Sequence, residues 1–288
     1  MTVEKAAQLG LCFGVRRAII LLRDAAKIHG KVETLGSVVH NRQVVECLEH
    51  LGVKKVGHWE EATGNVLAIP SHGLGEESIA EMHRHGFMIV DTTCPNVRRV
   101  QRAANELANG GFGVIIYGDA DHPEVNAVLG WARGKGMAMQ DSDIPLKSNL
   151  ACGRIGILSQ TTQNPEHFVS FTKKLIPAIL PRVAELRIVN TICDATRKRQ
   201  EAALDLVKRV DMMIVVGGYE SANTQRLAEV CAATGIETHH VETATEIECH
   251  WLRSPRIGLT AGASTPDEVI EGVIDKLREQ GHSFVNVS

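Results

Sequence analysis

The chain has 288 residues, of which 44% are hydrophobic and 23% are charged. This balance is typical of a globular protein with a packed core, and a formal net charge of −3 excludes the basic excess of a nucleic-acid-binding protein. The N-terminal segment lacks a basic region followed by an apolar stretch, and no apolar run is long enough to cross a bilayer, so we expect neither a signal peptide nor a membrane partner.

Three copies of one pattern follow in chain order. Each reads Cys-x-x-x-Arg and then Arg or Lys, and the copies are CFGVRR from Cys12, CPNVRR from Cys94 and CDATRK from Cys193. Apolar, β-rich stretches precede the second and third cysteines at 88–93 and 186–191, whereas no strong strand pattern precedes the first. Helical patterns follow all three, at 18–28, 100–109 and 201–210. Each cysteine is therefore predicted to lie at a junction with a helix N-terminus.

The repetition extends to two further positions in each copy. Twenty-eight residues after the cysteines come His40, His122 and Ser221, each following a short apolar strand. Three more strands, at 65–70, 154–159 and 256–261, end in Ser71-His72-Gly73, Gln160-Thr161-Thr162 and Gly262-Ala263-Ser264. Because ligands bind at the carboxyl ends of strands in open α/β sheets, these residues are expected to line a common pocket.

This organisation predicts an α/β protein of three similar domains. We expect the domains to cover residues 13–93, 94–190 and 191–288, with residues 1–12 packing on the third. Right-handed crossovers would place helices over the faces of each sheet.

Seven cysteines, an odd number, argue against a disulfide framework and for reduced thiols in the cytoplasm. Thiolates are stabilised at helix N-termini, and three of them in matched contexts predict a metal centre. Zinc remains an alternative, although its structural sites usually contain close Cys-x-x-Cys pairs; an iron–sulfur cluster tolerates ligands spread through the chain. We interpret the other four as core residues: Cys47, Cys152, Cys231 and Cys249.

The remaining polar residues suit an anion. Histidines, hydroxyls and helix N-termini are typical of phosphate or diphosphate sites, and the candidates are His40, His72, His122, Ser221, Asn223 and Ser264. Glu124, two residues after His122, is a carboxyl group among residues that suit an anion. Burial and anionic neighbours would raise its pKa, which fits a general acid; a first-turn helix glutamate is the alternative.

Taken together, the chain resembles the 4-hydroxy-3-methylbut-2-enyl diphosphate reductases of the non-mevalonate isoprenoid pathway. The matching stretches span nearly the whole chain and are CFGVRRAI, SVVHN, SHG, DTTCPNV, DHPEV, SQTT, ICDATRKRQEA, SANTQRL and TAGASTPD. Three positions depart from the common pattern: Ala222 replaces a serine, Asp121 a glycine and Gln101 a histidine.

The resemblance implies a trefoil of three pseudo-threefold-related α/β domains around one 4Fe-4S cluster held by Cys12, Cys94 and Cys193. It implies a diphosphate site of His40, His72, His122, Ser221, Asn223 and Ser264, with Ala222 contributing only backbone. It assigns proton delivery to Glu124, with Thr162 near the substrate hydroxyl. The implied reaction yields isopentenyl and dimethylallyl diphosphates, with electrons from a ferredoxin or flavodoxin.

Two other functions compete with this interpretation. One is a three-cysteine cluster dehydratase resembling quinolinate synthase, whose carboxylate substrate would favour arginines in the pocket. The other is a non-catalytic cluster protein that senses redox state and needs neither Glu124 nor a diphosphate site.

Overall fold

The computed structural model describes residues 2–143, 153–279 and 283–285. The chain folds into two compact units: Met1–Arg16 with Val39–Cys47 and Asp194–Ser288, and Arg17–Val38 with Leu48–Cys193. They contain three sheets whose described strand pairs are all parallel, which confirms the expected α/β class. Helices α1 (Phe13–His29) and α2 (Arg42–His50) have residues in both units. The three domain boundaries stay a prediction.

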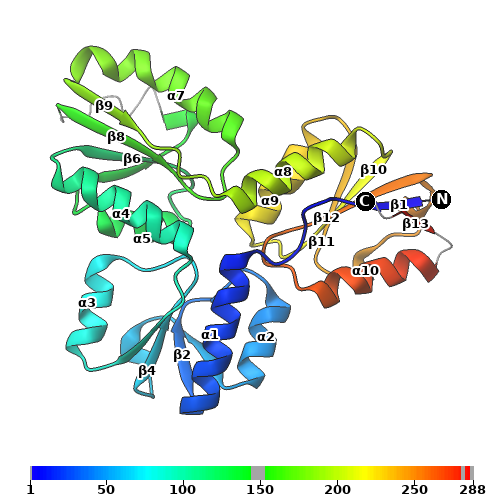
Figure 1. Cartoon of the computed structure of the whole chain (residues 1–288), viewed down its shortest axis with the longest axis horizontal. Helices are drawn as coiled ribbons and strands as arrows, with labels where there is room; N and C mark the ends of the chain where they lie inside the picture. Colours follow the sequence, from blue (N-terminus) through cyan, green and yellow to red (C-terminus); the bar gives the residue numbers. More distant parts are fainter. Residues whose placement is uncertain (1, 144–152, 280–282, 286–288) are drawn as a thin grey trace. The chain divides into compact units, whose positions relative to one another are not determined.

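The first unit contains a five-stranded sheet in the order β11-β10-β12-β1-β13 (Figure 1). Its strands are β1 (Thr2–Lys5), β10 (Met212–Val216), β11 (Glu237–Val241), β12 (Arg256–Ala261) and β13 (Ser283–Val285). Its helices are α8 (Asp194–Val207), α9 (Ala222–Ala232) and α10 (Asp267–Glu279). Alternate residues of β10 contribute to two apolar clusters, one with α10 and the other with α8 and α9. Burial on both faces explains why this strand is apolar throughout.

Strand β1 corrects the expectation that no strong strand precedes Cys12. Residues 2–5 pair in parallel with β12, from Thr2 opposite Arg256 to Lys5 opposite Leu259. The sequence TVEK has little strand character of its own, apart from Val3, whose side chain is fully buried. Residues 2–5 therefore form a strand because they pair with β12, although their own sequence pattern does not predict one.

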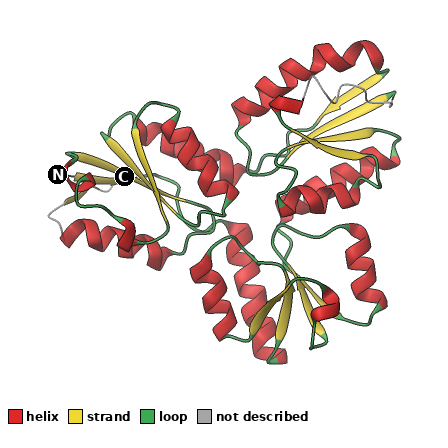
Figure 2. Cartoon of the chain, turned by 180° about the vertical axis from the view of Figure 1, so that it is seen from behind, coloured by secondary structure: helices red, strands yellow, loops and turns green. Residues whose placement is uncertain are grey.

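The second unit contains two four-stranded sheets, β3-β2-β4-β5 and β7-β6-β8-β9. The first is built of β2 (Val32–Leu35), β3 (Val53–Val56), β4 (Val66–Ile69) and β5 (Met88–Asp91), with α3 (Glu76–Arg84). The second is built of β6 (Gly113–Tyr117), β7 (Gly136–Met139), β8 (Arg154–Ser159) and β9 (Glu185–Ile188), with α4 (Pro95–Asn109), α5 (Pro123–Trp131) and α7 (Pro165–Ile179). Apolar residues of α4 and α5 cover one face of the second sheet, and those of α7 cover the other (Figure 2).

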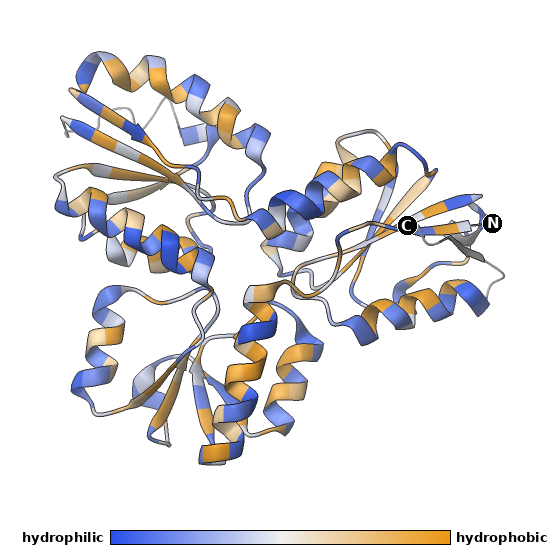
Figure 3. Ribbon diagram, viewed as in Figure 1, coloured by the Kyte–Doolittle hydropathy of each residue, from blue (hydrophilic) through white to orange (hydrophobic). Residues whose placement is uncertain are grey.

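One strand order recurs in all three sheets. The shared arrangement is β3-β2-β4-β5, β7-β6-β8-β9 and β11-β10-β12-β1. In the third sheet the N-terminal strand β1 takes the place of the fourth strand, and β13 lies beyond it. The helices are amphipathic, as the alternating hydropathy along α4 and α10 shows (Figure 3). Single 3-10 turns complete the described structure at Trp59–Glu61, Asp141–Asp143, Leu180–Arg182, Ala244–Glu246 and Trp251–Arg253. Because the strands of each sheet are parallel, the loops after them emerge at one edge.

Candidate active site

The three repeated cysteines occupy equivalent local positions. Cys94 is the N-cap of α4, Cys12 directly precedes α1, and Cys193 directly precedes α8. All three thiols are half-buried. A helix N-terminus carries free amides and a positive partial charge, and both stabilise a thiolate.

The backbone amide of each cysteine makes the same hydrogen bond within its own sheet. The donor follows the fourth strand in the recurring order, and the acceptor is a carbonyl in the loop after the neighbouring third strand. The bonds are Cys12 N–H to Ala263 O (2.9 Å), Cys94 N–H to Ser71 O (2.9 Å) and Cys193 N–H to Thr161 O (3.1 Å). The residues directly after these acceptors are three of the predicted site residues: Ser264, His72 and Thr162. The sequence repeat thus corresponds to one repeated structural arrangement.

Glu124 and Thr161 form a buried pair in the second unit. Glu124 lies in the first turn of α5 and is only 3% exposed. Thr161 donates its N–H to Glu124 Oε1 and its hydroxyl to Oε2, both at 2.6 Å. Burial raises the pKa of Glu124 above 4.5, although the two hydrogen bonds from Thr161 act in the opposite direction. Burial therefore favours the protonated form of this carboxyl group more than at an exposed glutamate.

Thr161, the neighbour of the predicted site residue Thr162, is the residue that contacts Glu124. The hydroxyl of Thr162 accepts a hydrogen bond from Gln160 Nε2 at 3.1 Å, whereas that of Thr161 reaches Glu124. Two adjacent threonines look alike in a sequence, and only the direction of the chain after β8 distinguishes them.

His72 and His122 present different ring nitrogens. The Nδ1 atom of His122 accepts a hydrogen bond from the Glu124 amide at 3.0 Å, so the proton of a neutral ring is on Nε2. The Nδ1 atom of His72 lies 3.1 Å from the carbonyl oxygen of Gly73, which places a proton on Nδ1. In these contacts Nδ1 of His122 is therefore an acceptor and Nδ1 of His72 a donor.

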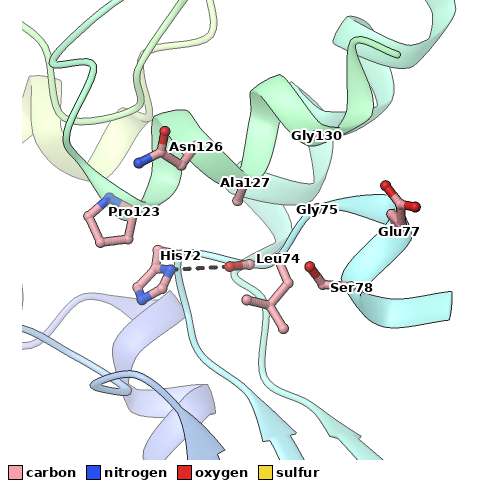
Figure 4. A pocket seen from close by; sticks show the side chains of 10 residues that line it. His72, Leu74, Gly75, Glu77, Ser78, Pro123, Asn126, Ala127 and Gly130 are labelled. Carbon is pink, nitrogen blue, oxygen red and sulfur yellow. Dashed lines mark hydrogen bonds between the residues drawn. The ribbon is translucent and has the colours of Figure 1, made fainter. Parts of the chain in front are cut away.

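His72 also lines a pocket of about 410 Å³ beside α5 (Figure 4). Pro123, Asn126 and Ala127 line it from α5, and Leu74 and Ser78 line it from the segment after β4. The His72 loop and helix α5, which carries Glu124 in its first turn, therefore line the same pocket.

In the first unit, three predicted site residues meet at the N-terminus of α9. Ser221 is the N-cap of this helix, and its hydroxyl lies 3.5 Å from that of Ser264. The Ser264 hydroxyl also donates to the carbonyl oxygen of His40 at 3.4 Å. A side chain at Gly218 would approach that carbonyl to 2.6 Å, so the close contact requires glycine.

Asn223 and Ala222 lie in the first turn of α9. The Asn223 carbonyl oxygen accepts a hydrogen bond from the Thr196 hydroxyl at 3.4 Å, and its buried Nδ2 has no partner among the described residues. An amide held in this way leaves its N–H groups for a ligand. Ala222, the first residue of α9, offers only its backbone.

Comparison with known proteins places these features in a family. Residues 3–278 match the family model described as LytB protein. The chain belongs to the LytB family.

Two similar proteins are named as the same kind of reductase. The chain is 47% identical over 282 residues to the 4-hydroxy-3-methylbut-2-enyl diphosphate reductase of Dehalococcoides mccartyi strain CBDB1, covering 96% of this chain and 98% of the relative. A solved structure of (E)-4-hydroxy-3-methyl-but-2-enyl diphosphate reductase is 38% identical, with a TM-score of 0.71 over 97% of this chain and all of the other. The resemblance identified from the sequence is thereby confirmed.

A second solved structure supports the fold alone. The Plasmodium falciparum protein named E-1-hydroxy-2-methyl-but-2-enyl-4-diphosphate reductase is 22% identical, with a TM-score of 0.91 over 99% of this chain and 91% of its own.

The remaining cysteines of this LytB chain require a correction. Cys231 is fully buried, as expected, but Cys47 and Cys249 are exposed rather than packed in the core. In α2 the buried side is formed by Val44 and Leu48, and Cys47 faces away from it. Cys152 lies outside the described residues.

Two features are absent from the described part of the chain. No group of three or more His, Cys, Asp or Glu side chains there is close enough to hold a metal ion. None of the helices described is both long and apolar enough to cross a membrane.

Proposed function

We propose that this LytB chain is a 4Fe-4S enzyme that reduces (E)-4-hydroxy-3-methylbut-2-enyl diphosphate. The substrate hydroxyl leaves as water when two electrons and two protons are taken up, and a new C–H bond forms. The products are isopentenyl and dimethylallyl diphosphates. The observation that carries the proposal is the repeated cysteine amide bond, in a chain 47% identical to a protein named as this reductase.

Cys12, Cys94 and Cys193 are the proposed ligands of one 4Fe-4S cluster. Three half-buried thiols, each directly before a helix, form a donor set that suits an iron–sulfur cluster and leaves one iron without a protein ligand. When bound, the cluster would supply electrons and a Lewis-acidic iron. The assignment rests on the equivalent local positions of the cysteines and on the family.

The diphosphate is proposed to bind His40, His72, His122, Ser221, Asn223 and Ser264. Support comes from the buried Nδ2 of Asn223, which has no partner among the described residues, and from the N-terminus of α9 capped by Ser221. Charge-assisted hydrogen bonds of this kind are the strongest that a protein offers to phosphate oxygens. The backbone of Ala222 takes the place of a serine hydroxyl.

Glu124 is proposed to deliver the proton to the departing hydroxyl. Its Oε2 lies 2.6 Å from the Thr161 hydroxyl, so a proton held by the carboxyl group can pass through Thr161. Thr162, on the same loop, is proposed to contact the substrate hydroxyl. The burial of the pair keeps bulk water from exchanging that proton.

The proposed electron donor is a ferredoxin or flavodoxin, and the proposed location is the cytoplasm, where the exposed thiols of Cys47 and Cys249 stay reduced. Turnover measurements on anaerobically reconstituted protein with a reduced viologen dye test the function. Formation of both products from the allylic diphosphate supports the reductase. Binding without turnover would favour a sensor, and dehydration of a carboxylate substrate would favour the quinolinate synthase type.

A further inference from the structure

The loop that carries His72 is held by two helices of the second unit. After the turn at Gly73, whose φ is +78°, the carbonyl oxygen of Leu74 accepts two hydrogen bonds. One comes from Trp131 Nε1 at 2.9 Å and the other from Gln101 Nε2 at 3.3 Å. Trp131 is the last residue of α5, and Gln101 is a buried residue of α4.

Two further contacts join the same segments. A side chain at Gly130 would approach the Cα atom of Gly75 to 2.6 Å, so the backbones of α5 and of the segment before α3 touch. Beside them, Arg133 forms an ion pair with Glu76 at 3.4 Å, although its φ of +51° is unfavourable for a residue other than glycine. The segment before α3 and the C-terminal end of α5 are therefore in close contact.

Helix α5 links this junction to the proposed site. Its N-terminal end carries His122 and Glu124, and its C-terminal end carries Trp131. Trp131 holds a carbonyl only two residues after His72. In Figure 4 the helix lies along the loop, with His72 near Pro123 and Leu74 and Gly75 near Gly130. Helix α5 thus connects the contact with the His72 loop at one end to His122 and Glu124 at the other.

We propose that Trp131 and Gln101 are positioning residues that hold the His72 loop at a fixed distance from His122 and Glu124. Neither residue belongs to the proposed contacts with substrate or cluster. The inference rests on the proposed function only in taking His72 as a diphosphate ligand. Losing a donor would leave the half-buried Leu74 carbonyl with one of its two partners. The loop could then shift, which would weaken diphosphate binding.

The test is Trp131→Phe, which removes the indole N–H and keeps an aromatic ring. The matched control is Trp59→Phe in the same unit, because Trp59 Nε1 is buried without a partner among the described residues. Trp131→Phe is expected to raise the KM of the allylic diphosphate and the Kd of inorganic diphosphate roughly 10-fold, because losing a partly buried hydrogen bond costs free energy on this scale. The value of kcat should stay within about 3-fold, and the iron content should not change, because Glu124 and the cysteines are untouched.

The rate of backbone amide hydrogen exchange gives a second measurement that does not depend on catalytic activity. Hydrogen exchange of residues 70–75 in the holoenzyme should accelerate in Trp131→Phe and not in Trp59→Phe. If Trp131→Phe does not fold, Gln101→Glu, which replaces the amide donor with an oxygen at the same size, should give the same rise in KM and Kd. An unchanged diphosphate Kd in the folded variant, or an equal rise in the control, would overturn the inference. Wild-type protein that binds diphosphate without reducing the allylic substrate would instead overturn the proposed function alone.

Discussion

Replacing Thr161 by valine removes the hydroxyl from the buried pair with Glu124 and nearly preserves the shape of the side chain. The lost bond is short, at 2.6 Å, and joins a neutral hydroxyl to a carboxyl group that is 3% exposed. Removing one partner of such a buried hydrogen bond costs about 1–3 kcal/mol. If that energy is lost in the transition state, turnover should fall by roughly 5- to 150-fold.

The same variant should also change the pH dependence. The bonds from Thr161 lower the pKa of Glu124, which burial raises, so losing the hydroxyl raises this pKa further. A general acid works while protonated, and the alkaline limb of the kcat profile should therefore move to higher pH. Stopped-flow oxidation of a reduced viologen dye between pH 6 and 9 measures both effects.

Thr172→Val provides the control, since this buried threonine of α7 donates its hydroxyl only to the nearby carbonyl of Val169. Its kcat and pH profile should match those of the wild type. Thr162→Val separates the two adjacent hydroxyls, and we expect a smaller loss there than at Thr161. A Thr161→Val enzyme with wild-type kcat and an unmoved alkaline limb would refute the relay.

Further variants test the other parts of the site and fold. Glu124→Gln should lower kcat roughly 10²–10⁴-fold. Because burial raises the pKa of Glu124, the wild type loses stability as pH rises and the neutral glutamine does not. Thermal unfolding should therefore show the variant gaining stability relative to the wild type with increasing pH. Burial alone would raise the pKa of Glu33, but Lys31 and neighbouring amides lower it to about 2. Glu33→Gln should therefore cost about 2 kcal/mol at pH 7 after allowance for solvent around Lys31. In urea titrations this difference should shrink as pH falls below about 4.5 and be lost only below the folded pKa of about 2. Cys94→Ser should lose most of its iron under anaerobic metal analysis, and Cys47→Ser should retain a full complement.

Much of the local structure could be predicted because the signals are local. The runs 154–159 and 256–261 are apolar on both faces, and they form β8 and β12 with those bounds. The helices after Cys94 and Cys193 could likewise be predicted from their amphipathic periodicity. Strands buried on both faces and amphipathic helices can be recognised from the pattern of a few consecutive residues.

Other features depend on residues far away in the chain. Strand β1 is stabilised by β12, more than 250 residues later, and its own sequence gives little indication. The choice of Thr161 over Thr162 depends on where α5 places Glu124. The exposure of Cys47 could have been predicted from the sequence, because Val44 and Leu48 mark the buried side of that helix.

The central claim is that this LytB chain holds a cluster through three cysteines and reduces an allylic diphosphate. The most direct measurement is anaerobic turnover of (E)-4-hydroxy-3-methylbut-2-enyl diphosphate by reconstituted protein, with iron and sulfide determined on the same sample. We predict about four irons and four sulfides per chain, conversion to isopentenyl and dimethylallyl diphosphates, and loss of both iron and activity in Cys193→Ser. A protein that binds zinc instead of iron, or a fully loaded protein that leaves the substrate unchanged, would contradict the account.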